Sequence, residues 1–183
     1  MHKELLILGF VGDSGPISGY DIHRIVRAHG ELFADLKRPN MYYLLERLAG
    51  EKYLRVRAEA GTRGRRGERL LYALTAAGKR RFRELLDSEV TRFGTVHTGI
   101  EVAVIFLAQL TPAAGIALLQ KRLQIVELHR KRVAAAFGDV GKRGPHARIA
   151  ADHMLTLVDA EIGWIKRSIA TLQSESASAG SRR

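Results

Sequence analysis

The fold is decided by residues 37–75, which read KRPNMYYLLERLAGEKYLRVRAEAGTRGRRGERLLYALT. Pro39 marks the start of a helix, because a proline in the first helical turn loses no backbone hydrogen bond. Apolar residues then follow at positions i, i+3, i+4 and i+7, which places them on one face of that helix: Met41, Leu44, Leu45 and Leu48. The opposite face carries Asn40, Tyr43 and Arg47. We therefore predict an amphipathic helix with one apolar and one polar face.

The residue pattern changes after this helix. Residues 53–58 alternate apolar with basic side chains, as a half-buried strand does, and residues 69–74 are a second candidate strand. The loop between them, AGTRGRRG at 60–67, is rich in glycine and arginine. We predict a β-hairpin with a mobile and strongly cationic tip. Thr75 is expected to cap a further helix over residues 76–86.

Two more helices are predicted upstream of this stretch. Residues 4–11 form an apolar run that stops at the Gly/Ser/Pro cluster of residues 12–16. The next helix should begin at an N-cap, carry inward apolar residues and end at a glycine: Ser18 with its partner Asp21, then Ile22, Ile25 and Val26, then Gly30. The order helix, helix, helix, hairpin, helix predicts a winged helix-turn-helix domain of the α+β type over residues 1–88.

The second half of the chain reads as helical throughout, so the whole protein is predicted to be mainly α. Residues 101–110 are apolar on nearly every side and are expected to be buried. Thr111 and Pro112 begin a long helix to about Phe137 whose apolar positions approximate a heptad seam. A last helix over residues 146–172 should turn seven residues inward: Ile149, Met154, Leu157, Val158, Ile162, Ile165 and Ile169. We predict an all-α dimerisation domain over residues 89–175.

The end of the chain, from Ser174, is rich in Ser, Ala, Gly and Arg and is expected to be disordered, with residues 176–183 set apart as a tail.

Composition and charge limit the classes of partner and of binding site that the chain can have. The net charge of +11 favours polyanionic partners. The stretch from Arg55 to Arg83 contains ten basic residues and only two acidic ones. The chain contains no cysteine, which excludes disulfides and thiolate metal sites. We see no signal peptide and no apolar run as long as the roughly 18–20 residues of a membrane span, so we expect a cytoplasmic protein without membrane contact.

Catalytic and metal sites are not expected. The sequence shows no nucleophile–base pair, no paired carboxylates and no phosphate loop, so we predict no enzyme activity and no cofactor. His129, His146 and His153 are interpreted as surface residues, because His146 and His153 lie seven positions apart, too far to chelate one metal together.

The predicted architecture suits nucleic acid. The major groove of DNA admits one helix, whose first residues then reach base edges; Arg38, Asn40 and Tyr43 stand there. Tyr42 and Arg47 are further candidate DNA contacts on the same helix. The hairpin tip would carry Arg63, Arg65 and Arg66 to the phosphate backbone or the minor groove. The alternative is an RNA-binding or nonspecific nucleic-acid module that uses the Arg/Gly loop, although an aromatic stacking platform is missing.

Three stretches resemble the PadR-like transcriptional regulators: LLILG at 5–9 with GYDI at 19–22, NMY at 40–42 with Leu45, Arg47 and Leu48, and YALTAAG at 72–78. The resemblance covers about residues 4–86. It implies a homodimer that binds a double-stranded DNA operator, usually as a repressor. By motif position, Asn40 and Tyr42 take the role of the recognition helix and the hairpin arginines that of the basic wing. The second half is similar to the larger PadR subfamily, which implies dimerising helices and a small-molecule effector that releases the repressor.

Several residues leave two interpretations open. Lys52 stands where the family usually has glycine, so either it adopts a left-handed conformation or the helix ends differently. Tyr43 replaces the usual proline of the family and adds a candidate DNA contact. The Tyr42 hydroxyl either binds a phosphate or its ring fills core space. Trp164, the only tryptophan, either lines a pocket for a planar aromatic effector or lies in the core of the dimer interface.

Overall fold

The protein was analysed as a computed structural model, which describes residues 2–28, 36–59, 69–94, 98–138 and 144–180. It forms two compact units, residues 1–94 and 95–183. Two predictions lie outside the described residues, namely Gly30 as a helix C-cap and the placement of Arg63, Arg65 and Arg66 at the hairpin tip. In the described part of the chain, no helix is long and apolar enough to cross a membrane.

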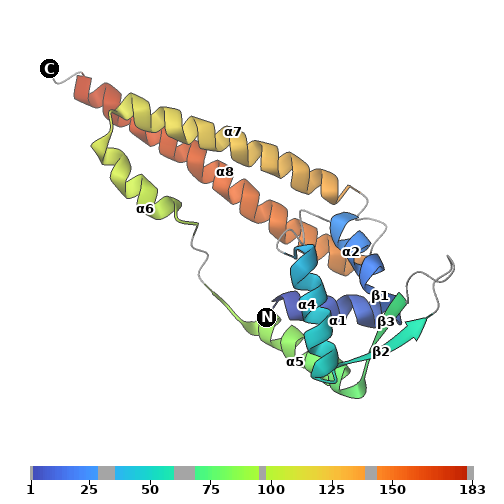
Figure 1. Cartoon of the computed structure of the whole chain (residues 1–183). Helices are drawn as coiled ribbons and strands as arrows, with labels where there is room; N and C mark the ends of the chain where they lie inside the picture. The colour runs from blue at the N-terminus through green and yellow to red at the C-terminus, as the bar shows by residue number, and fades with distance from the viewer. Residues whose placement is uncertain (1, 29–35, 60–68, 95–97, 139–143, 181–183) are drawn as a thin grey trace. The chain divides into compact units, whose positions relative to one another are not determined.

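The first unit is a winged helix-turn-helix, as predicted. Its three-stranded antiparallel sheet has the order β1-β3-β2, and helices pack against it (Figure 1). The elements are α1 (His2–Ser14), β1 (Ile17–Ser18), α2 (Gly19–Ala28), α4 (Arg38–Gly50), β2 (Leu54–Glu59), β3 (Arg69–Leu74) and α5 (Ala76–Thr91). The last helix continues past the predicted end at residue 86, and the unit therefore ends at Gly94 rather than at residue 88.

The apolar face of α4 lies in the centre of this unit. Met41, Leu45 and Leu48 are fully buried and Leu44 is nearly so, which confirms the predicted stripe. They pack in one cluster with residues from α1 and α2, among them Ile7, Leu8 and Ile22. Burial of each such side chain stabilises the unit by about 1.5–3 kcal/mol, so this cluster fixes α4 firmly in place.

Local capping agrees with the sequence. The Ser18 hydroxyl accepts a hydrogen bond from the Asp21 amide at 3.2 Å, and the Thr75 hydroxyl accepts one from the Gly78 amide at 3.0 Å. Lys52 has a φ of 63°, so the left-handed alternative is the correct one. Its amide donates to the Ala49 carbonyl at 3.0 Å, which turns the chain out of α4 and into β2.

The hairpin strands lie where the sequence placed them, but their burial differs from the prediction. They pair from Leu54 with Leu74 to Glu59 with Arg69. In β2 only Leu54 is buried, and Val56 keeps 40% of its surface exposed. The half-buried strand was therefore a wrong expectation, because the hairpin extends beyond the helices that cover its first residues (Figure 1).

The second unit is an antiparallel pair of long helices with a short helix beside it. Its elements are α6 (Ile100–Ile105), the 3₁₀ turn η1 (Phe106–Gln109), α7 (Pro112–Ala136) and α8 (Pro145–Gly180). Leu119, Ile165 and Ile169 form the centre of the α7–α8 contact. The Thr111 hydroxyl accepts a hydrogen bond from the Ala114 amide at 3.3 Å, so α7 begins as predicted.

Three expectations for the second unit are wrong in the single chain. No residue of α6 or η1 is buried, and Ile149 and Leu157 of α8 are 67% and 49% exposed. The reason is geometric, since two paired helices bury only the stripe where they touch. The stretch from residue 174 is not disordered but helical to Gly180. Its serine hydroxyls bond to carbonyls of the preceding turn: Ser174, Ser176 and Ser178.

Candidate nucleic-acid interface

The N-terminal end of α4 is open to solvent. No side chain caps it, since Lys37 at the N-cap position makes no such hydrogen bond, and Pro39 occupies the first turn. Arg38 and Asn40 are exposed, and Tyr43 keeps 63% of its surface exposed. The start of a helix carries a partial positive charge and attracts anions. This end therefore combines a dipole that suits a phosphate with side chains that can read a base edge.

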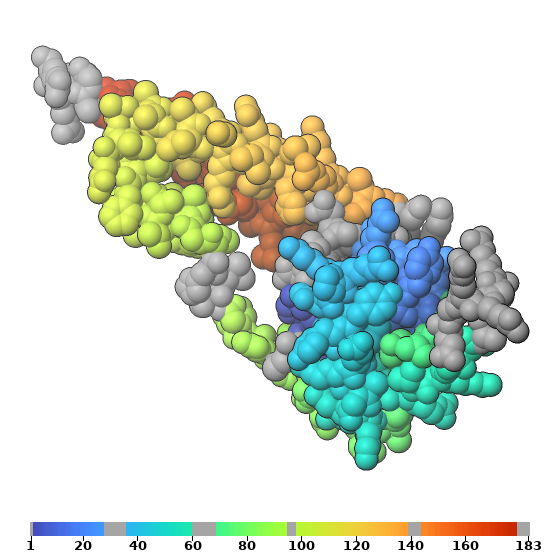
Figure 2. All heavy atoms as spheres, viewed as in Figure 1, coloured from blue at the N-terminus to red at the C-terminus, as the bar shows by residue number. Residues whose placement is uncertain are grey.

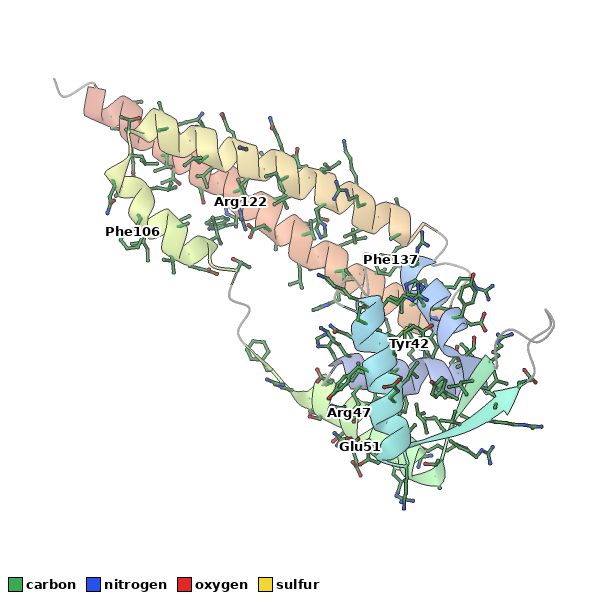
Figure 3. The ribbon with its side chains drawn as sticks, viewed as in Figure 1. Tyr42, Arg47, Glu51, Phe106, Arg122 and Phe137 are labelled. Atoms are coloured by element: carbon green, nitrogen blue, oxygen red, sulfur yellow. The ribbon has the colours of Figure 1, made fainter. Side chains whose placement is uncertain are left out.

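The Tyr42 ring contacts Arg38 at this end of α4. It is half-buried, and the Arg38 guanidinium lies 5.7 Å from the centre of its ring, a cation–π distance (Figure 3). The ring also packs on α2, where a Cβ added to Gly19 would lie only 2.8 Å from Tyr42 Cε1. The structure thus gives the Tyr42 ring a packing role, while a phosphate contact by its hydroxyl stays a prediction.

Arg47 is held by carboxylates of the domain itself. Its Nη2 donates to Glu4 Oε2 at 2.9 Å, and its Nε lies 3.5 Å from an oxygen of Glu51 (Figure 3). Arg81 of α5 donates to the other oxygen of Glu4 at 2.8 Å, and this hydrogen bond is the largest cause of a raised pKa of Arg81. Glu4 therefore joins α1, α4 and α5. With its guanidinium bound in this way, Arg47 leaves our set of proposed DNA contacts.

The sequence did not single out the arginines within the hairpin. Arg55 and Arg57 are exposed on β2, where they pair with Ala73 and Leu71 of β3 and share one face of the ribbon. Their alternation with apolar residues was the available signal. In Figure 2 the strands β2 and β3 lie beside α4 on the same side of the first unit. The hairpin therefore places a cationic ribbon beside α4.

Residues 7–84 match the family model of the transcriptional regulator PadR-like family. The first unit is a PadR-like domain. PadR of Bacillus subtilis in complex with operator DNA superposes with a TM-score of 0.76 at 19% identity, over 92% of this chain and 98% of that one. The same protein in complex with p-coumaric acid gives 0.74 at 18% identity, over 93% and 98%.

The virulence activator AphA of Vibrio cholerae gives a TM-score of 0.69 at 17% identity, over 94% of this chain and 99% of that one. These likenesses extend beyond the PadR-like domain into the second unit and show that the whole chain shares the fold of these regulators. Comparison with curated protein sequences gives no match.

Trp164 lies outside the PadR-like domain, at the edge of a groove in the second unit. One part of its ring packs against the core cluster of Leu119, Ile165 and Ile169. The groove has a volume of about 560 Å³ and is lined by residues of both long helices, with Val126 and Val158 as apolar walls. An ion pair stands on its wall, since Arg122 lies 2.7 Å from Glu161 (Figure 3). Trp164 therefore has both a core contact and a face in a cavity.

Proposed function

We propose that this protein is a homodimeric transcriptional regulator that binds a specific double-stranded DNA operator. The observation that carries the proposal is the uncapped end of α4, with Arg38, Asn40 and Tyr43 exposed. An α-helix fits the major groove, and its first residues then meet the base edges. The PadR structure in complex with operator DNA, which shares the fold, supports this assignment.

The side chains divide by role. Asn40 suits an adenine, which it can bind with two hydrogen bonds, and Arg38 and Tyr43 suit a phosphate or a guanine. Arg55 and Arg57 lie on the ribbon that leads to the tip, where Arg63, Arg65 and Arg66 are assigned to the backbone or the minor groove from sequence alone. The ribbon supplies affinity and α4 supplies sequence preference.

The test begins with selection of a duplex from a random pool. Binding of the selected and of a scrambled duplex is then followed by fluorescence anisotropy. We expect Asn40→Ala to lower the preference for the selected duplex about tenfold, with little loss on scrambled DNA. Gln173→Ala is the matched control, because it removes the same kind of carboxamide group from an exposed position on α8. Equal affinity for both duplexes, or tighter binding of single-stranded RNA, would refute operator recognition.

The homodimer is assigned to the second unit. Val102, Ile105 and Phe106 are 60%, 70% and 57% exposed in the single chain. Three apolar residues along α7 are also exposed, namely Leu118, Ile125 and Leu128. Large exposed apolar patches on soluble proteins commonly mark interaction surfaces. A second copy would cover these residues and present two α4 helices to a symmetric operator.

We further propose that the regulator is a repressor and that a small planar aromatic effector releases it from DNA. The groove beside Trp164 has apolar walls and an ion pair, as small-molecule sites commonly do. PadR in complex with p-coumaric acid shares the fold. Since Trp164 is the only tryptophan, its fluorescence reports directly on ligands in this groove. A quenching titration with hydroxycinnamic acids tests the idea, and compounds that quench Trp164 without weakening DNA binding would refute release.

A further inference from the structure

A cluster of three polar residues joins the hairpin to α2. The Ser18 hydroxyl donates to Asp21 Oδ2 at 2.7 Å. Arg69 donates to the Ser18 oxygen at 3.2 Å and also to Asp21 Oδ2. Ser18 is 2% exposed, which is rare for a polar residue, and the Asp21 side chain keeps only 20% of its surface exposed. We refer to Ser18, Asp21 and Arg69 as the hairpin cluster.

The cluster lies at the far end of the described hairpin. Arg69 is the first residue of β3 and pairs with Glu59, the last residue of β2. The near end is held separately, because the Thr75 hydroxyl donates to the Lys52 carbonyl at 2.8 Å. The pairing of β1 with β3 stops at Ser18 and Leu71, before Arg69 is reached.

Apolar packing does little to hold this far end. Beyond Leu54 every residue of β2 is exposed, and Leu70 of β3 is 44% exposed. A two-stranded ribbon that has neither face covered is only marginally stable, so few contacts fix its direction. The hairpin cluster is therefore placed where an additional contact has the largest effect on the direction of the ribbon.

The charge of Asp21 is unexpected at this location. Its pKa is lowered, first by the hydrogen bond from Ser18 and then, against partial burial, by the charges of Arg69 and Arg24, so it is ionised at neutral pH. An anion near a DNA-binding face repels the phosphates. On electrostatic grounds alone, removal of this charge should strengthen DNA binding, whereas loss of a contact that holds the ribbon should weaken it. The sign of the change in affinity therefore distinguishes the two effects.

We propose that the hairpin cluster sets the orientation of the β2–β3 hairpin relative to α2 and α4, and that Arg69 acts as a positioning residue through Asp21 rather than as a DNA contact. This inference rests on the proposed function for its effect on DNA, but the anchoring of the ribbon does not depend on DNA. Breaking the cluster from either side should have the same consequence.

The experiment uses the full chain with Asp21→Asn, Arg69→Ala and the double variant. Binding to the selected duplex is measured by anisotropy over a series of salt concentrations. We expect each single variant to weaken binding about three- to fivefold, the size of one partly exposed ion pair, and the double variant to be no weaker than Arg69→Ala. Asp21→Asn should leave the salt slope unchanged, that is, the slope of the logarithm of the binding constant against the logarithm of the salt concentration.

Arg24→Ala is the matched control. It removes the same charge as Arg69→Ala, and Arg24 also pairs with Asp21, at 3.3 Å, but within α2. We expect it to weaken binding less than Arg69→Ala does. Tighter or unchanged binding by Asp21→Asn, with a reduced salt slope in Arg69→Ala alone, would make Arg69 a phosphate contact and overturn the inference.

Hydrogen exchange of the β3 amides provides a measurement without DNA. Asp21→Asn and Arg69→Ala should both speed exchange in residues 69–72, whereas Arg24→Ala should not. If no duplex binds the wild-type protein, the proposed function fails while this measurement still decides the anchoring. Unchanged exchange in both variants would overturn the inference even if DNA binding were lost.

Discussion

Gly78 is fixed by a close approach of two backbone segments. A Cβ at this position would lie 2.1 Å from the carbonyl oxygen of Tyr53, far inside van der Waals contact. That carbonyl already accepts a hydrogen bond from the Thr75 amide at 3.0 Å. Glycine is therefore required to bring the start of α5 against the start of the hairpin.

We expect Gly78→Ala to destabilise the PadR-like domain by about 3 kcal/mol, because rigid backbone has to move to make room for the methyl group. Gly50→Ala is the control. Nothing lies within 4 Å of a Cβ at Gly50, so the higher helix propensity of alanine should make this change neutral or slightly stabilising. Urea unfolding of both variants, followed by circular dichroism, measures the difference; equal midpoints would show that the two segments are not in such close contact.

Individual residues were predictable where their neighbours in sequence determine them. The stripe of α4 and the cap at Thr75 follow from short-range patterns, whereas the sequence left two conformations open for Lys52, of which the structure has the left-handed one. The partner of Arg47 did not follow, because Glu4 is far away along the chain and nothing near either residue indicates the pairing.

At the scale of elements, the hairpin strands were located correctly but their burial was not. Alternation in a strand shows which residues share a face, whereas it does not show whether another element covers that face. The same limit applies to α6, whose apolar residues were expected to be buried, whereas none of them is buried in the single chain. Sequence pattern predicts the need for a covering surface and leaves its source open.

The hairpin tip is expected to supply general affinity for DNA. The double change Arg65→Ala with Arg66→Ala should weaken binding to selected and scrambled duplexes alike and reduce the salt slope by about 1–2, since each lost phosphate contact removes about 0.9. Lys131→Ala with Arg132→Ala removes the same charge from exposed positions on α7 and serves as control. A salt slope that is identical in both double variants would exclude the tip from the interface.

At the scale of the molecule, we expect a dimer that persists at nanomolar concentration. Ile105→Glu with Phe106→Glu should shift it to monomer, because two charges would have to be buried in the contact between copies. Tyr20→Glu changes an equally exposed residue of the first unit and should leave the dimer intact. Sedimentation velocity measures all three proteins, and a wild-type monomer would contradict the assignment of a homodimer to the second unit.

The aromatic residues are distributed so that each unit has its own natural chromophore. All five tyrosines stand in the first unit, from Tyr20 to Tyr72, and the single tryptophan stands in the second. Emission from tryptophan therefore follows the helical pair, while tyrosine absorbance follows the winged helix, in one unlabelled sample. Whether an event in one unit is transmitted to the other becomes a matter of comparing two optical traces recorded on the same molecules.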